Sequence, residues 1–237
     1  MKIRTIKTEK ILAGKITLEQ FLDKYIKELK EKSIIVISSK VISYIENRIV
    51  KKPANIEKII LEESDHISKG KNKYNRKITI KHNAFLSNAG IDPGVGSYIL
   101  LPKDPQKVAK EIYRILTKKF KKKSFGVIIT DSRSLPLRMG SMGVAIGFWG
   151  FMPLKNYENK YDVFGEKIGH CQVNIVDALA GVAVLAMGEG DEQTPISVID
   201  SIDSIKFSSN YPTKRELNEF YLSLKEDKFH QFYKDFK

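Results

Sequence analysis

Two short apolar segments constrain the fold more than any other feature of the chain. Residues Phe125–Thr130 have the sequence FGVIIT, and residues Ser33–Ser38 have the sequence SIIVIS. Both are rich in β-branched residues and too short for a buried helix, so both predict strands with two covered faces. A helical pattern precedes each strand: one follows the capping box at Thr17 and extends to about residue 31, and one follows Asp104-Pro105.

Other patterns predict further helices and strands without a regular strand–helix alternation. Helices are expected at 55–64, at 177–187 and after a second capping box at Thr213, and strands at 77–81 and 194–199. This mixture predicts an α+β (mixed α/β) fold, with mixed sheets and flanking helices. We expect a domain of residues 1–210, which could divide into a basic part, 1–124, and a second part, 125–210. A C-terminal helix is expected within 211–237.

The charge of the chain is strongly positive and unevenly distributed. The 237 residues carry a net charge of +13, and residues 1–124 alone hold 29 Lys and Arg against 13 Asp and Glu. Such a surplus indicates an anionic partner: nucleic acid, an acidic membrane or a polyanionic small molecule.

The sequence gives no sign of a membrane protein or of a disulfide framework. The apolar stretch from Met139 is too short and too glycine-rich to cross a bilayer, and the start of the chain does not resemble a signal peptide. The one cysteine, Cys171, cannot form an internal disulfide. We therefore expect a cytoplasmic protein that does not bind membranes.

Two acidic residues occupy positions suited to a metal site. Asp131 directly follows the strand 125–130, so the sheet fixes its position, and the Ser132 hydroxyl beside it could complete a coordination shell. Asp92 follows a turn of small residues, 87–91. The alternative for Asp131 is that it only caps a turn, as aspartate commonly does after a strand.

The segment Gly188–Asp191, with the sequence GEGD, follows the predicted helix 177–187. Its glycines suit a loop whose backbone binds a phosphate or a metal. The alternative is a glycine helix cap followed by an acidic surface turn. The phosphate-binding motif GxxxxGK[ST] does not occur in the chain.

Two features of the segment 138–150 have more than one interpretation. Arg138 is isolated among apolar residues, which indicates a pairing with a phosphate or with a carboxylate such as Asp162. Glycines recur from Gly140 to Gly150 around Trp149. Close backbone packing is the favoured explanation for them, and a subunit contact or a binding loop are the alternatives.

Seven segments, taken in chain order, resemble the coenzyme F420-0:L-glutamate ligases, the γ-glutamyl ligases of the deazaflavin coenzyme pathway. The segments are Ser39–Ser43, Ser87–Asp92, Ile129–Ser132 with Arg138 and Gly140, Gly143–Gly147, Tyr161–Gly165, Asp177–Ala180 and Met187–Asp191. The chain departs from the family pattern at four places. Tyr44 stands where the family has a lysine, the next four residues read Ile45-Glu46-Asn47-Arg48 where the family has Ala-Glu-Gly-Arg, the loop 93–96 is shorter, and Ser134-Leu135 replace Gly-Arg.

The resemblance implies an amide ligase with an intertwined homodimeric mixed α/β fold. Members of the family use GTP and two divalent cations. For this chain we expect GTP or ATP as the nucleotide, and Mg²⁺ or Mn²⁺ as the cations. They convert a carboxylate of an anionic acceptor into an acyl phosphate and attach L-glutamate to it. The acceptor implied here is either coenzyme F420-0-like or folate-like.

The resemblance also assigns roles to individual residues. Asp92 and Asp131 would hold one cation, and Ser132 and Glu189 would contribute to the second. Asp131 and Arg138 would act in catalysis. Nucleotide contacts would come from Ser39, Lys40, Met187, Gly188, Gly190, Asp191 and Thr194.

Two other hypotheses remain open on the sequence alone. A nucleic-acid-binding protein could use the basic segments 69–81 and 103–123, although no nucleic-acid-binding motif is present. A catalytically inactive relative could retain only the fold and the dimer, given the altered loops.

Overall fold

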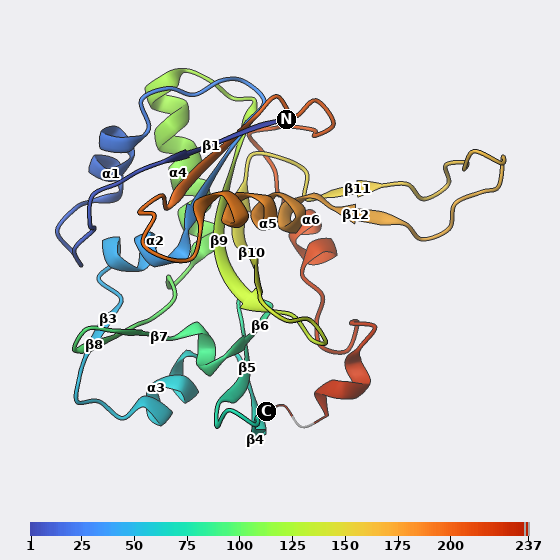
Figure 1. The fold of residues 1–237 in the computed structure, drawn as a ribbon. Helices are drawn as coiled ribbons and strands as arrows, with labels where there is room; N and C mark the ends of the chain where they lie inside the picture. Colours follow the sequence, from blue (N-terminus) through green and yellow to red (C-terminus); the bar gives the residue numbers. More distant parts are fainter. Residues whose placement is uncertain (235, 237) are drawn as a thin grey trace.

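A five-stranded sheet forms the centre of the computed structural model, which describes residues 1–234 and 236 (Figure 1). β2 and β9 are parallel, and the other neighbouring pairs are antiparallel. The strand order is β1 (Lys2–Ile6), β13 (Ile196–Asp200), β2 (Ser33–Ser38), β9 (Phe125–Ser134) and β10 (Ser141–Trp149).

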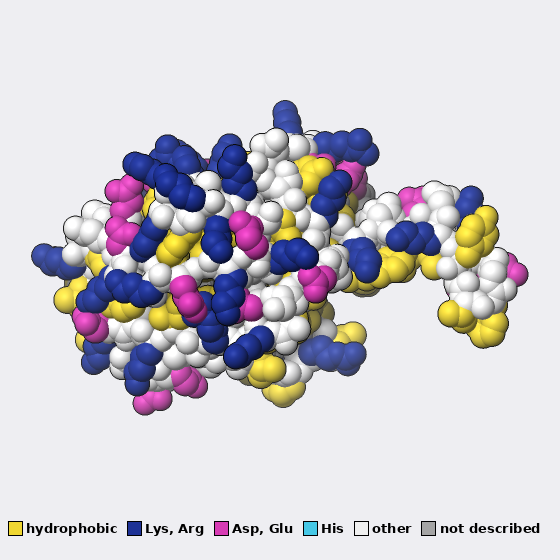
Figure 2. Space-filling model, turned by 90° about the horizontal axis from the view of Figure 1, so that it is seen from above, with side chains coloured by type: hydrophobic (Ala, Val, Ile, Leu, Met, Phe, Trp, Pro, Cys, Tyr) yellow, Lys and Arg dark blue, Asp and Glu magenta, His cyan; other side chains and the backbone are white. Residues whose placement is uncertain are grey.

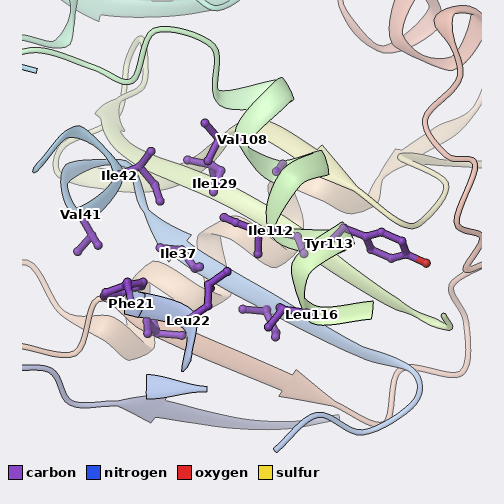
Figure 3. Packing of buried hydrophobic residues seen from close by; sticks show 14 of the residues in the cluster. Phe21, Leu22, Ile37, Val41, Ile42, Val108, Ile112, Tyr113, Leu116 and Ile129 are labelled. Atoms are coloured by element: carbon purple, nitrogen blue, oxygen red, sulfur yellow. The ribbon is translucent and has the colours of Figure 1, made fainter. Parts of the chain in front are cut away.

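Helices cover both faces of this sheet, which explains why β2 and β9 are apolar at successive positions. Because successive side chains point to opposite faces, Ile35 and Ile37 of β2 join one core cluster and Ile34 and Val36 join the other. The first cluster includes side chains from α1 (Leu18–Tyr25), α2 (Ser39–Ile45) and α4 (Pro105–Phe120) (Figure 3). The second packs against α5 (Ile175–Met187) and α6 (Lys214–Phe220).

Two small antiparallel sheets lie below the central sheet in the view of Figure 1. One contains β3 (Ile49–Lys51), β8 (Ser97–Ile99) and β7 (Asp92–Gly94). The other contains β4 (His66–Lys71), β5 (Lys77–Lys81) and β6 (Ala84–Ser87). The helix α3 (Ile56–Glu63) and the single turn η1 (Asn88–Gly90) connect these strands.

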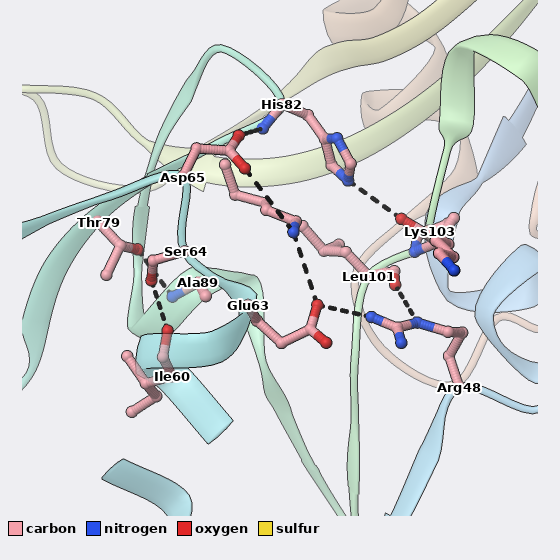
Figure 4. A network of polar contacts seen from close by, with 12 residues as sticks. Arg48, Ile60, Glu63, Ser64, Asp65, Thr79, His82, Ala89, Leu101 and Lys103 are labelled. Carbon is pink, nitrogen blue, oxygen red and sulfur yellow. Dashed lines mark hydrogen bonds and ion pairs between the residues drawn. The ribbon is translucent and has the colours of Figure 1, made fainter. Parts of the chain in front are cut away.

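A polar network ties these small sheets to the segment that enters α4 (Figure 4). Arg48 Nη2 lies 2.6 Å from Glu63 Oε2, and Arg48 Nε donates to the carbonyl of Leu101 at 3.0 Å. Lys81 Nζ lies 3.6 Å from the same Glu63 carboxylate. Both side chains of the Arg48–Glu63 pair are largely buried, so loss of one would leave an uncompensated charge.

One hairpin extends away from the body of the molecule. β11 (Leu154–Asn156) and β12 (Gln172–Asn174) pair at its base, and residues 157–171 form its outer part, which we call the arm (Figures 1 and 2). Hydrophobic side chains are exposed on the arm: Val163 is 93% and Phe164 87% exposed. Such side chains are normally covered in a stable assembly.

The structure confirms the α+β fold class and most of the predicted elements. The predicted strands at 33–38 and 77–81 occur with those bounds, and the strand predicted at 125–130 continues to Ser134. No helix in the part of the chain that the structure describes is long and apolar enough to cross a membrane.

Two helices are shorter than predicted. α1 ends at Tyr25 rather than near residue 31, because Ile26 has an extended backbone and the following chain still buries Leu29 without helical geometry. The C-terminal helix occupies only 214–220 of the predicted segment, because Tyr221 is extended. In both cases apolar residues at helical spacing pack on the core from an irregular segment.

The glycine-rich stretch from Gly140 is mainly the strand β10, and close packing explains two of its glycines. A Cβ atom on Gly143 would lie 2.4 Å from the Ala180 carbonyl oxygen of α5. A Cβ atom on Gly147 would lie 2.4 Å from the Pro105 carbonyl oxygen at the start of α4. These glycines let both helices approach β10 closely, so the packing interpretation is confirmed.

Candidate active site

The parallel pairing of β2 and β9 brings the first site residues together. Ser38 and Thr130 are partners in the register of these strands, and Ser39 and Asp131 follow them. Because the two strands run in the same direction, the residues after these partners lie beside each other where β2 ends, although β9 continues to Ser134. The Ser39 hydroxyl donates to Asp131 Oδ1 at 2.8 Å.

Asp92 reaches the same edge from the small sheets. Lys40 Nζ, on α2, lies 2.8 Å from Asp92 Oδ2. Just before Asp92, three consecutive residues have left-handed backbone angles, with φ of 51° at Asn88, 57° at Ala89 and 69° at Gly90. This conformation is unusual for non-glycine residues, and a hydrogen bond from the Ala89 amide to Thr79 Oγ1 at 2.7 Å holds it.

The surroundings of Asp131 and Lys40 shift the pKa values of both side chains. Burial raises the pKa of Asp131 to about 6, and the Asp92 charge acts in the same direction, while the hydrogen bond from Ser39 opposes both. Burial alone would lower the pKa of Lys40, but the Asp92 and Asp131 carboxylates hold that pKa above its usual value. The space between the two carboxylates therefore attracts a cation.

A second oxygen pair lies beside the first. The Ser132 hydroxyl donates to Glu189 Oε1 at 2.5 Å, which links β9 to the loop after α5. Within that loop the Gly190 amide donates to Glu192 Oε2 at 2.8 Å, and Thr194 Oγ1 donates to the Met187 carbonyl at 2.6 Å. The loop is thus ordered by its own polar groups at the mouth of the site.

A cavity of about 1070 Å³ opens between these groups and the small sheets. This is large enough for a nucleotide with part of a second substrate. Most of the residues selected from the sequence line it: Lys40, Asp92, Asp131, Ser132, Met187, Gly188, Glu189, Gly190 and Thr194. Ser39 reaches the cavity through its hydrogen bond to Asp131.

Arg138 and Asp191 are not brought into the lining of this cavity. Both residues are exposed. Of the two alternatives for Arg138, the pairing with Asp162 does not occur among the described residues, where Asp162 Oδ1 accepts from the amides of Phe164 and Glu166 on the arm. Arg138 belongs to a turn that projects into solvent, where Leu137 is fully exposed as well.

Several residues that line the cavity were not selected from the sequence. Arg133, Arg76, Asn88 and Glu192 all contribute to the lining. Arg133 was detectable in principle, because it stands two residues after Asp131 on one strand and so points to the same side. Burial lowers the pKa of the Arg133 guanidinium, against the opposing influence of Asp177 and Asp131. Arg76 carries no signal in the sequence that separates it from the surrounding basic residues.

The oxygen-rich set of side chains suits a hard divalent cation. Within residues 1–234 and 236, no group of three or more His, Cys, Asp or Glu side chains converges as a preformed metal cage. Mg²⁺ does not require such a cage, since it commonly uses one or two carboxylates together with water and substrate phosphates. Asp92, which is paired with Lys40, and Asp131, which lies close enough for the Asp92 charge to raise its pKa, fit that pattern.

Comparison with known proteins identifies the family. The sequence model of the F420-0:gamma-glutamyl ligase family matches residues 44–201, which include Asp92, Asp131, Ser132 and Glu189. The chain belongs to this family. It is therefore a ligase enzyme, as the resemblance implied.

Curated relatives agree with this assignment. The chain is 34% identical over 203 residues to the coenzyme F420:L-glutamate ligase of Methanococcus maripaludis strain S2, covering 77% of this chain and 80% of the relative. It is 31% identical over 205 residues to the enzyme of the same name from Methanocaldococcus jannaschii, covering 78% and 80%. The corresponding Methanopyrus kandleri enzyme is 39% identical over 112 residues, or 46% and 44% of the two chains.

The raised pKa of Asp131 predicts a pH-dependent stability. Because its folded-state pKa is about 6 and its ordinary value is 3.8, the folded protein holds the proton more tightly than the unfolded chain. The free energy of unfolding should therefore fall as pH rises from about 4 to about 6 through this group. Asp131→Asn should stabilise the protein by about 1–2 kcal/mol at pH 7.5 and have little effect below pH 4.

Thermal or urea unfolding of the variant across this pH range measures the effect. Asp191→Asn, which changes an exposed carboxylate, is the control and should show no gain. If the Asp131→Asn variant and the wild type are equally stable at pH 7.5, the Asp131 carboxylate does not destabilise the fold and the prediction is wrong.

Proposed function

We propose that the protein attaches L-glutamate to a carboxylate of a coenzyme F420-0-like acceptor, with a nucleoside triphosphate as the activating co-substrate. The observation that carries the proposal is the meeting of Asp131, Ser39 and the Asp92–Lys40 pair at the ends of β2 and β9. It is supported by the family assignment and by the names of the relatives, which state this activity for those proteins.

The reaction requires activation because a free carboxylate is unreactive toward an amine. Transfer of the γ-phosphoryl group to a carboxylate oxygen of the acceptor gives an acyl phosphate and a nucleoside diphosphate. The glutamate amine then attacks the acyl carbon, the carbon–oxygen bond to phosphate breaks, and phosphate leaves. The amine loses a proton as the amide forms. A positioned cavity that excludes water favours amide formation over hydrolysis.

Residues that line the large cavity would position the substrates and supply charge for these reaction steps. Lys40 can contact a phosphate once its pairing with Asp92 is exchanged, and the backbone of Gly188 and Gly190 lines the same cavity. The Asp131 carboxylate supplies a negative charge at the same edge of the sheet. The excess of Lys and Arg within residues 1–124 favours the entry of the substrates, because all of them are anions.

Divalent cations are part of the proposal. Asp92 and Asp131 would hold one Mg²⁺ or Mn²⁺ ion, and Ser132 and Glu189 would contribute to a second. Such ions neutralise the charge of the transferred phosphate in phosphoryl transfer. The acceptor could also be folate-like, and either GTP or ATP could serve.

Loss of the Asp131 carboxylate should abolish the reaction. Asp131→Asn keeps the size of the side chain and its hydrogen bond from Ser39, and so removes only the charge. Because cation binding needs that charge, we expect product formation to fall at least 1000-fold while the fold is retained. The measurement is mass spectrometry of the glutamylated acceptor, with nucleoside diphosphate release in parallel.

The assay uses a panel of coenzyme F420-0, a dihydropteroate and a tetrahydrofolate, each with GTP and with ATP. Glu62→Gln, which changes an exposed carboxylate on α3, is the matched control and should keep full activity. Full turnover by Asp131→Asn would contradict the proposed site. Absence of a mass shift in wild-type protein with every acceptor would contradict the proposed reaction and favour an inactive relative.

We also propose a homodimer in which the arm packs against a second copy of the chain. Val163 and Phe164 are adjacent and almost fully exposed, and Leu185 on α5 is 85% exposed; adjoining exposed apolar side chains are typical of protein interaction surfaces. The arm lies far from the rest of its own chain in Figure 1, so its apolar side chains have no nearby surface of their own to cover them. Another copy supplies such a surface by symmetry.

Charged substitutions on the arm should separate the subunits. Phe164→Asp together with Val163→Asp would bury unpaired charges in the interface, so we expect the mass measured by light scattering to fall from a dimer to a monomer. The control is Lys160→Glu, an exposed charge change on the same arm. A wild-type protein that is monomeric at micromolar concentration would contradict the dimer.

A further inference from the structure

A second and smaller cavity adjoins the site on the far side of Arg133. Its volume is about 160 Å³. Segments distant in sequence form its wall: β9, β10, the start of α5, the turn between β5 and β6, and the chain that follows α6. The lining residues are Asn83, Ala84, Arg133, Ala145, Asn174, Asp177, Phe220, Tyr221, Leu222 and Asp227. Arg133 lines both this cavity and the large one.

Two polar groups of this small cavity lack a hydrogen-bond partner. Among the described residues, Arg133 Nε and the Tyr221 hydroxyl are buried atoms with nothing to bond to. Buried polar groups are almost always paired in proteins, because an unpaired group loses its hydration without compensation. Both groups can donate a hydrogen bond, and one belongs to a cation. Their natural complement is an anion with two acceptor oxygens.

The carboxylates already in the lining do not supply this complement. Asp177 Oδ1 accepts from the Ala145 amide at 2.9 Å, and its Oδ2 accepts from Asn174 Nδ2 at 2.6 Å. Asp227 Oδ1 accepts from the Phe229 amide at 2.7 Å. No ion pair involving Arg133 occurs in the described part of the chain, although the Asp177 charge lies near enough to influence it. The guanidinium is therefore open to a ligand.

We infer that Arg133 and Tyr221 bind the side-chain carboxylate of the amino-acid substrate in this small cavity. The inference rests on the proposed function, which makes L-glutamate a substrate. A volume of about 160 Å³ is too small for a nucleotide or a ring-bearing acceptor, and it suits a short carboxylate-bearing side chain. Since Arg133 borders both cavities, a glutamate held by its side chain presents its amine toward the large cavity that Asp131 lines.

This arrangement explains how the enzyme would distinguish glutamate from glutamine. A guanidinium and a phenol hydroxyl together give charge-assisted hydrogen bonds to a carboxylate. The uncharged amide of glutamine would offer Arg133 no negative charge in this pocket. Sites built to pair a polar group of the substrate reject analogues that cannot pair with it.

Steady-state kinetics with L-glutamate and with L-glutamine test the inference. Arg133→Gln should raise KM for L-glutamate at least tenfold, leave KM for the nucleotide unchanged, and reduce the preference for L-glutamate over L-glutamine. Tyr221→Phe, which removes only the hydroxyl, should act in the same direction by a smaller factor. Arg133→Lys keeps the charge and should restore part of the preference. Arg114→Gln, at an exposed arginine of α4, is the matched control and should change neither constant.

The outcomes separate this pocket from other roles of Arg133. Equal losses with L-glutamate and L-glutamine would overturn the inference, since a contact to the α-carboxylate or a structural role affects both substrates alike. Lower stability with unchanged KM values would overturn it as well, and would mean that the cavity holds only water.

A binding measurement makes the test independent of turnover. Equilibrium dialysis of labelled L-glutamate against the full-length protein, with Mg²⁺ and nucleotide present, reports the pocket even if no acceptor is glutamylated. Binding by the wild type that is lost in Arg133→Gln supports the pocket although the proposed reaction has failed. Absence of binding by the wild type, or equal binding by both proteins, overturns it.

Discussion

The parallel pairing of β2 with β9 is the contact on which the whole site depends. β2 and β9 are the one pair of adjacent strands in the described central sheet that run parallel, and they are in register from Ser33–Phe125 to Ser38–Thr130. Ser39, the first residue after β2, and Asp131, within β9, therefore lie side by side and are joined by a hydrogen bond. Both strands are buried on two faces, by α4 on one and α5 on the other. The core therefore holds the reacting groups in place, and the small sheets need only bring Asp92 to them.

Electrostatics then gives the site its chemistry. A carboxylate that is both buried and close to a second carboxylate is less stable than it would be in water, which is how the pKa of Asp131 comes to lie near 6. In the proposed function, a bound cation would offset this cost to the free energy of unfolding. Lys40 satisfies part of that demand in the structure. Functional sites commonly retain such unfavourable groups, because a cation or a substrate relieves them.

The sequence predicted those parts of the structure that local patterns determine. Continuous apolar runs marked β2 and β9, and the capping box at Thr17 marked the start of α1. Patterns failed where tertiary contacts decide the outcome: Leu29 and Tyr221 pack on the core or its edge from extended chain, although their spacing is helical. Asp92, Asp131 and Glu189 were selected because they follow predicted turns or strands, and all three line the large cavity. Arg138 does not line it, and no pattern in the sequence shows that its turn projects into solvent.

We propose that the oxygen groups of Asp92, Asp131, Ser132 and Glu189 hold the ions that accompany the nucleotide. A crystal structure of the protein with GTP and Mn²⁺, with anomalous diffraction recorded at the manganese edge, tests this directly. We expect one anomalous peak bound by Asp92 and Asp131, with Lys40 displaced from Asp92, and a second beside Ser132 and Glu189. A bound nucleotide whose manganese lies elsewhere, with the Lys40–Asp92 pair intact, would contradict it.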